Sequence, residues 1–273
     1  MPRFTTDDGV SLAYTDTGRG RPVVLVQGFT APATAWVLTE DALLDAGYRV
    51  VAFDRRSHGA SDTPAHGQRM ARHGRDLAEL LEHLELSDAV LVGASMGGNV
   101  IWAYLDQQGT SAVSGVVIVD QTPKMLNADD WPYGFYGFEA GNAGTLFAAG
   151  VPPTGRGRAA DASTAEFGRL FERLGGPPAL RDGAAPQTLG LLQDHALQDY
   201  RDVVTRAGCP VLMVAGRGSQ VWPCEHAAAA VADNPHGRAV VIEDAGHTVN
   251  LDQPDAFNAV LLEFLAGLDP AKG

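Results

Sequence analysis

Short runs of apolar, mostly β-branched residues recur along this 273-residue chain and constrain its fold more than any other feature. The runs occupy residues 22–28, 48–54, 88–93, 115–119, 209–216 and 238–244. Continuous apolar runs of this length predict strands that are buried on both faces. A half-exposed strand over 10–18 precedes them, and amphipathic or apolar helical segments separate them, at 74–86, 97–109, 224–233 and 254–268. Strands that alternate with helices predict an α/β fold with a mostly parallel sheet and helices on both faces.

The alternation is interrupted once, between residues 121 and 195. This stretch contains the aromatic cluster "WPYGFYGF" and Gly/Pro-rich stretches such as "GVPPTGRG", with short helical pieces between them. Such a composition is typical of irregular structure rather than of another sheet strand. We therefore predict a core domain formed by residues 1–120 and 196–273, with residues 121–195 inserted as a cap sub-domain.

Composition and charge limit the possible partners. Twenty Lys and Arg against 33 Asp and Glu give a formal net charge of -13, which argues against nucleic acid or an anionic membrane surface. No apolar run approaches the roughly 18 residues of a membrane span, and "MPRFTTDDGV" has no apolar signal core, so we predict a cytoplasmic protein. No spacing of His, Cys or Asp suggests a metal site, and no dinucleotide loop is present, so we predict no metal and no cofactor. The sequence does not decide whether the oligomeric state is a monomer or a homodimer.

The stretch "VLVGASMGGN" places the motif G-A-S-M-G between a buried strand and a helix. This is the context of a nucleophile elbow, in which a serine sits on a sharp turn and its hydroxyl projects above the sheet. Gly93 and Gly97 remove the side chains that would clash in such a turn. The motif therefore predicts Ser95 as a nucleophile; an ordinary glycine-rich turn is the alternative.

The stretch "EDAGHTVNLDQP" follows the last predicted strand and contains His247. Hydrolases with a nucleophile elbow carry their triad in the order serine, acid, histidine, with the histidine after the last strand. Of the eight histidines in the chain, only His247 satisfies this order and placement. We predict that His247 is the general base, and a surface-loop histidine is the alternative reading.

With these motifs the chain resembles the α/β-hydrolase superfamily, and within it the small esterases, lactonases and cofactor-free haloperoxidases. The resemblance covers nearly the whole chain, including "QGFTAPATAW" and "FDRRSHGASD". It implies an α/β-hydrolase fold with an eight-stranded sheet and an inserted helical cap. It also implies an oxyanion hole formed by the backbone N–H groups of Phe29 and Met96. Gln27 stands where the family usually has histidine; a backbone donor survives that change, although the loop's hydrogen bonds can differ.

The family usually carries its acid in the loop after the next-to-last strand, where this chain has Ser219. Serine cannot supply the carboxylate that stabilises an imidazolium. Asp120 ends a buried apolar run, at a position that a minority of the superfamily uses for its acid, and a buried carboxylate is costly unless it is paired. We therefore predict that Asp120 pairs with His247. A turn or helix-cap residue is the alternative for Asp120, and Glu225 and Asp244 are weaker candidates for the acid.

Aromatic residues near the start of the inserted stretch suggest a pocket wall above Ser95. We predict that the following residues bind substrate: Trp131, Tyr133, Phe135, Tyr136 and Trp222. The alternative is that the rings of this cluster form a small core of the cap itself.

These features together predict a serine hydrolase that cleaves an apolar carboxylic ester or lactone through an acyl-enzyme. Two alternatives remain open. The resemblance to cofactor-free haloperoxidases implies a possible perhydrolase, in which hydrogen peroxide captures the acyl-enzyme. The fold also occurs in ligand-binding proteins that have lost hydrolysis, which the absence of an acid at position 219 would fit.

Overall fold

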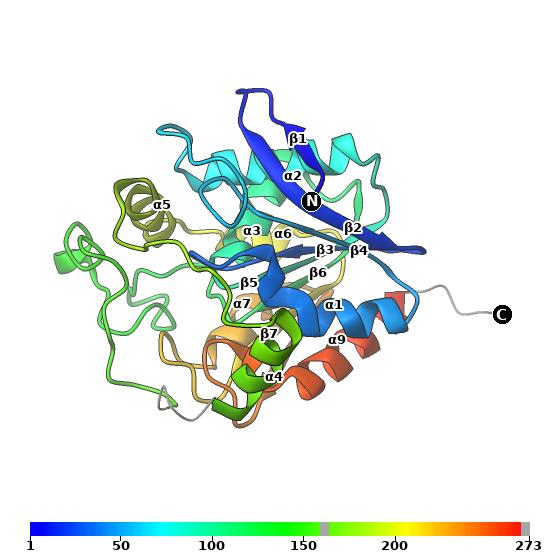
Figure 1. Ribbon diagram of the computed structural model, residues 1–273. Coiled ribbons are helices and arrows are strands. Elements are labelled where there is room, and N and C mark those ends of the chain that lie inside the picture. The colour runs from blue at the N-terminus through cyan, green and yellow to red at the C-terminus, as the bar shows by residue number, and fades with distance from the viewer. Residues whose placement is uncertain (159–163, 269–273) are drawn as a thin grey trace.

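The computed structural model describes residues 1–158 and 164–268; residues 159–163 of the predicted cap and 269–273 of the predicted core lie outside it. Its centre is an eight-stranded sheet in the order β1-β2-β4-β3-β5-β6-β7-β8 (Figure 1). The strands are β1 (Arg3–Thr5), β2 (Ser11–Gly18), β3 (Pro22–Val26), β4 (Arg49–Phe53), β5 (Ala89–Ala94), β6 (Val113–Val119), β7 (Val211–Gly216) and β8 (Gly237–Ile242). Strand β2 is antiparallel to both β1 and β4, and every other pair is parallel.

Helices cover both faces of the sheet. Within the described ranges they are η1 (Ala33–Trp36), α1 (Val37–Asp45), α2 (Met70–His83), α3 (Met96–Gln108), η2 (Ala140–Asn142), α4 (Thr164–Leu174), α5 (Pro186–Ala196), α6 (Arg201–Arg206), α7 (His226–Val231), α8 (Val249–Asp252) and α9 (Pro254–Leu268). Helices α1 and α9 lie side by side on one face, and α2, α3, α6 and α7 pack on the other (Figure 1). None of the helices in the described part of the chain combines the length and apolar character that a bilayer crossing needs.

The two faces of the sheet carry two separate hydrophobic clusters. Strand β3 illustrates how the sequence builds both, because successive side chains point to opposite faces. Val24 and Val26 pack toward α3, whereas Val23 and Leu25 pack toward Trp36 and α9. All four side chains are fully buried. This explains why the central strands read as continuous apolar runs rather than as alternating ones.

The predicted eight-stranded, mostly parallel sheet with helices on both faces is confirmed. Strand bounds differ from the prediction by up to two residues, and α2 begins at Met70, four residues before the predicted helix. Strand β1 was not predicted, because a three-residue strand is too short to show a period of two.

The inserted segment (residues 121–195), green in Figure 1, lies at one end of the sheet. Its aromatic rings do not form a separate core. Phe147 packs edge-on against Phe135 and Phe138, with ring centroids 4.9 and 5.0 Å apart, and all three belong to the cluster that contains α3. On the opposite face, Leu170 of α4 packs with Val37 of α1 and with α8. The inserted segment therefore extends one core cluster and forms a third, small cluster with α1 and α8.

Candidate active site

Ser95 lies on a sharp turn between β5 and α3. Its backbone has φ 51° and ψ -131°, a region that non-glycine residues rarely adopt and that costs energy to hold. Glycines on either side make the turn possible. A Cβ atom at Gly97 would lie 2.2 Å from the carbonyl oxygen of Val26, and one at Gly93 would lie 2.6 Å from the Gly97 carbonyl. The G-x-S-x-G pattern is therefore a direct consequence of how closely α3 packs on β3 and β5.

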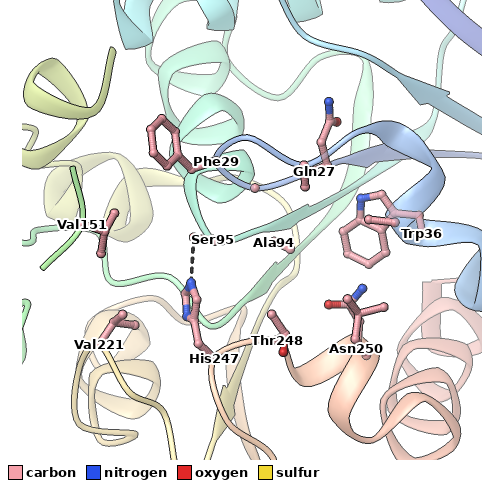
Figure 2. A pocket seen from close by; sticks show the side chains of 14 residues that line it. Gln27, Phe29, Trp36, Ala94, Ser95, Val151, Val221, His247, Thr248 and Asn250 are labelled. Carbon is pink, nitrogen blue, oxygen red and sulfur yellow. Dashed lines mark hydrogen bonds between the residues drawn. The ribbon is translucent and has the colours of Figure 1, made fainter. Parts of the chain in front are cut away.

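The structure brings the three predicted residues of the triad together. The Ser95 hydroxyl oxygen lies 2.9 Å from His247 Nε2 (Figure 2), and His247 Nδ1 lies 2.8 Å from Asp120 Oδ2. His247 follows β8 in the chain, and its backbone N–H donates to the side-chain oxygen of Gln220 at 2.8 Å. Three segments that are far apart in the sequence thus form one continuous hydrogen-bonded series.

The Asp120 carboxylate is fully buried at the end of β6 and is well supplied with hydrogen-bond donors. The backbone N–H of Gly216 donates to Oδ1 at 3.0 Å, and the hydroxyl of Ser219 donates to Oδ2 at 2.6 Å. A second imidazole nitrogen, His226 Nε2, lies 3.6 Å from Oδ1, just beyond hydrogen-bond reach. Burial raises the pKa of Asp120, but the imidazoles of His226 and His247 outweigh it and lower this pKa to about 2. The group is therefore an anion at neutral pH.

Ser219 contacts Asp120 directly from the position where the family usually carries its acid. The two positions meet because β6 and β7 are neighbouring parallel strands, with Val119 paired to Val214. In the described part of the chain, neither Glu225 nor Asp244, the weaker candidates, makes an ion pair or hydrogen bond with His247.

The loop after β3 passes beside Ser95 and carries Phe29, one of the two predicted oxyanion donors, whereas the other, Met96, is the first residue of α3. A Cβ atom on Gly28 would lie only 3.2 Å from the Ser95 Cβ. Among the described residues, neither the Phe29 nor the Met96 backbone N–H has a hydrogen-bond acceptor. Both amides are thus available to an external oxygen.

A buried guanidinium holds this loop in place. Arg55 donates to the carbonyl oxygens of Gln27 and Gly28, at 3.2 and 2.8 Å. In a trans peptide the C=O and N–H point in opposite directions. Arg55 therefore directs the Phe29 N–H away from itself by fixing the Gly28 carbonyl. Burial lowers the pKa of Arg55 to about 9, so it remains charged at neutral pH.

Two imidazoles accept from the same guanidinium. Nitrogen atoms of His58 and His73 lie 2.9 and 3.0 Å from Arg55. Burial lowers the pKa of both histidines well below the usual value near 6.5, and the Arg55 charge lowers it further. Both rings are therefore neutral, as acceptors from a cation must be.

Ser95 and His247 line two cavities. The larger, of about 260 Å³, is mostly apolar and extends toward η1 and α8; Trp36 and Asn250 lie across it from Ser95 (Figure 2). The smaller, of about 50 Å³, lies under the inserted segment. Its wall is formed by Phe29, Ser95, Met96, Met125, Phe135, Phe147, Val151, Leu192, His195, Val221, Trp222 and His247. An ester bound at Ser95 therefore has space for one arm on each side.

Of the five predicted substrate-binding residues, Phe135 and Trp222 line the smaller cavity. Among the described residues that line the two cavities, Trp131, Tyr133 and Tyr136 do not appear, so substrate binding by these three stays a prediction. The Trp131 indole N–H donates to the Lys124 carbonyl at 3.0 Å, and its ring packs edge-on against Tyr133. The Tyr136 ring lies instead beneath the guanidinium of Arg156. Sequence spacing could not separate inward rings from outward ones in an irregular segment.

Sequence reasoning missed other cavity-lining residues. Asn250 lies three residues after His247, so the histidine motif itself could have indicated it. Its side chain has no hydrogen-bond partner in the described part of the chain and is 6% exposed. His195 comes from α5, a hundred positions beyond Ser95 in the chain, and nothing in its sequence neighbourhood points to the site.

Known proteins of similar sequence and structure have this same arrangement of sheet and helices. A sequence model described as the alpha/beta hydrolase fold matches residues 21–254. A non-heme chloroperoxidase of Kitasatospora aureofaciens is 30% identical over 275 residues, which cover 97% of this chain and 99% of that protein. A bromoperoxidase structure from Bacillus anthracis has 27% identity and a TM-score of 0.77, covering 94% of this chain and 96% of that one. An esterase structure from Exiguobacterium antarcticum has 25% identity and a TM-score of 0.75, covering 97% and 98%. The chain belongs to the α/β hydrolase fold family.

Proposed function

We propose that this protein is a serine hydrolase that cleaves a carboxylic ester or lactone through an acyl-enzyme. One observation carries the proposal. The Ser95 hydroxyl, the His247 imidazole and the Asp120 carboxylate form a continuous hydrogen-bonded series, with distances of 2.9 and 2.8 Å. The hydroxyl can act as a nucleophile, the imidazole as its general base and the carboxylate as the partner of the imidazole.

The proposed reaction uses these groups in order. Ser95 attacks the ester carbonyl while His247 Nε2 takes the serine proton. Asp120 holds the imidazole in the correct tautomer and stabilises the imidazolium. The N–H groups of Phe29 and Met96 bind the oxyanion, an interaction typically worth about 3 kcal/mol per donor. His247 then protonates the leaving alcohol, and water hydrolyses the acyl-enzyme by the same route in reverse.

An apolar substrate body fits the larger cavity. Its wall is mostly carbon, with Trp36, Leu251 and Val221 among the contributing side chains. Burial of apolar surface there stabilises binding by roughly 25 cal/mol per Å². The esterases among the structural relatives support an ester as the reacting group.

The test is covalent labelling with a fluorophosphonate probe, together with hydrolysis of 4-nitrophenyl esters. We expect the protein to label and to turn over, and Ser95→Ala to lose both. Ser111→Ala, a change at an exposed serine outside both cavities, is the matched control and should keep both. A folded wild-type protein that neither labels nor hydrolyses any ester would support the ligand-binding alternative instead.

Perhydrolysis is a second candidate, which the 30% identity to a non-heme chloroperoxidase favours. Hydrogen peroxide would replace water as the acceptor, giving a peroxy acid and free Ser95. The peroxy acid would then oxidise bromide and return to the carboxylic acid. Bromination of monochlorodimedone in the presence of acetate, peroxide and bromide tests for this perhydrolase activity. Bromination that survives Ser95→Ala would exclude an acyl-enzyme route.

A further inference from the structure

The smaller cavity contains two polar groups that the proposed reaction does not use. His195 and Trp222 are 3% and 2% exposed, and both line this cavity beside Ser95. The Trp222 indole N–H has no hydrogen-bond partner among the described residues, but it is closed off from the cavity as well as from solvent. Apart from Ser95 and His247, the remaining side chains of the wall are apolar. The His195 imidazole in such a wall requires an explanation, because a buried donor without an acceptor is unfavourable.

A hydrogen bond with Asn99 favours one tautomer of His195. The side-chain amide of Asn99, which is fully buried in α3, donates to His195 Nδ1 at 3.1 Å. Burial lowers the pKa of His195 to about 3, with a further contribution from the charge of Arg55, so the ring is neutral. A neutral imidazole that accepts at Nδ1 carries its single proton on Nε2. Within residues 1–158 and 164–268 this second N–H has no acceptor.

The cavity is small enough to select the group that can enter it. A single water needs about 10–15 Å³ of such space. The 50 Å³ available beside Ser95 therefore admits about three or four non-hydrogen atoms. One arm of an ester must be short to enter, while the larger cavity can take the longer arm.

We infer that the smaller cavity binds a short substrate arm that carries a hydrogen-bond-accepting oxygen, with His195 Nε2–H as its donor. The inference rests on the proposed ester hydrolysis at Ser95 and names its substrate class. The oxygen belongs to an alkoxy or oxo substituent on either the acyl or the alcohol side of the ester. His195 is in this view a specificity-determining residue, since it distinguishes an oxygen atom from a methylene of the same size.

The experiment compares ester pairs of equal size that differ by one atom. For the acyl arm the pair is 4-nitrophenyl methoxyacetate and 4-nitrophenyl butyrate. For the alcohol arm it is 2-methoxyethyl and butyl phenylacetate. The ratio of kcat/KM, oxygen-bearing over alkyl, is measured in the wild type and in His195→Phe. Dividing the two ratios cancels the intrinsic reactivity of each ester.

We expect His195→Phe to lower this ratio at least fivefold in one of the two pairs, and the pair affected identifies the arm. His195→Gln keeps an N–H donor near the same place and should restore most of the preference. Leu192→Ala enlarges the same cavity without changing its polarity, so it should alter size preference and leave the oxygen preference within twofold.

An unchanged ratio in both pairs overturns the inference, as does a ratio that rises, since a rise would mean that His195 Nε2 accepts rather than donates. Should His195→Phe fail to fold by melting analysis, His195→Met takes its place, because it also removes the donor and its flexible side chain fills irregular space in a core. Turnover without oxygen preference rejects this inference alone. A folded wild type that hydrolyses none of the four esters and does not label with the fluorophosphonate probe rejects the proposed function.

Discussion

Asp120 is the residue on which the charge balance of the site depends. It is fully buried, which raises its pKa, yet the neighbouring imidazoles of His226 and His247 keep this pKa at about 2. A carboxylate held so firmly as an anion can stabilise a positive charge on His247 throughout catalysis. Its backbone has φ 45°, which the side chain's partners must hold in place.

Asp120→Asn should lower kcat at least about a hundredfold with little change in KM, because an amide N–H facing His247 Nδ1 favours the wrong tautomer. Steady-state kinetics on a 4-nitrophenyl ester measure this. Ser219→Ala is the matched control: it removes one donor from Asp120 but leaves the charge, so its loss should stay below about tenfold. Nearly unchanged turnover in Asp120→Asn would return Asp120 to the role of a turn residue.

Ser219→Asp tests how the two positions share one site. The new carboxylate would face Asp120 across a distance now spanned by a 2.6 Å hydrogen bond. Two carboxylates this close cannot both ionise, so one pKa must rise. The variant should therefore melt below the wild type at pH 8, with a smaller difference at pH 5, where the shared proton is more easily held. Melting curves at both pH values check the sign, and a difference that grows toward pH 5 would contradict it.

In the Asp120→Asn background, Ser219→Asp should recover part of the activity.

At the scale of elements, the strand-turn-helix unit around Ser95 is the most tightly constrained part of the molecule. Helix α3 approaches β3 so closely that position 97 has room only for hydrogen beyond its Cα. Gly97→Ala should destabilise the protein by about 3 kcal/mol or more, since either the helix or the β3 backbone must move. Gly144→Ala, where nothing lies within 4 Å of the added carbon, is the control and should stay within about 0.5 kcal/mol. Denaturant unfolding compares the two variants, and equal stabilities would mean that the elbow accommodates the added methyl group without strain.

The elements themselves could be predicted to the extent that their residues repeat with a period. Strands β3 to β7 are continuous apolar runs, and α2 has a pronounced apolar face, so all were located from the sequence. The elbow and the His247 loop were found because their motifs are local. The inserted segment has no such regularity: Trp131 and Phe135 lie four residues apart, and only one of them reaches a cavity. His195 could not be found either, since its role depends on packing against Asn99 from another element.

At the scale of the whole molecule, three buried neutral histidines make stability depend on pH. His58, His73 and His195 titrate well below 6.5 in the folded state, whereas the unfolded chain binds protons from about pH 6.5 downward. The destabilisation that these three histidines cause together is absent above about pH 6.5 and grows as the pH falls. Each group removes about 1.4 kcal/mol of stability per pH unit below 6.5, so three remove about 4 kcal/mol per unit.

The free energy of unfolding should therefore be nearly flat from pH 8 to 7 and should fall steeply below pH 6. Since a domain is typically stable by about 5–15 kcal/mol, the protein should unfold between about pH 5 and 3. Denaturant titrations at steps of half a pH unit measure the slope. His195→Phe removes one titrating group and should reduce that slope by about a third. A wild type equally stable at pH 7 and 5 would mean that these histidines protonate within the fold.

The meeting of Ser219 with Asp120 also has an evolutionary consequence. Because β6 and β7 end side by side, a carboxylate can reach the same imidazole from either strand. During evolution, two point substitutions, one after β6 and one after β7, are enough to move the acid from one strand to the next, with no change to the nucleophile, the base or the backbone. An ancestor with both acids would have kept its histidine partnered while sharing one proton between two carboxylates. The strand that carries the acid is thus a changeable trait, whereas the order serine, acid, histidine and the spatial position of the charge stay the same.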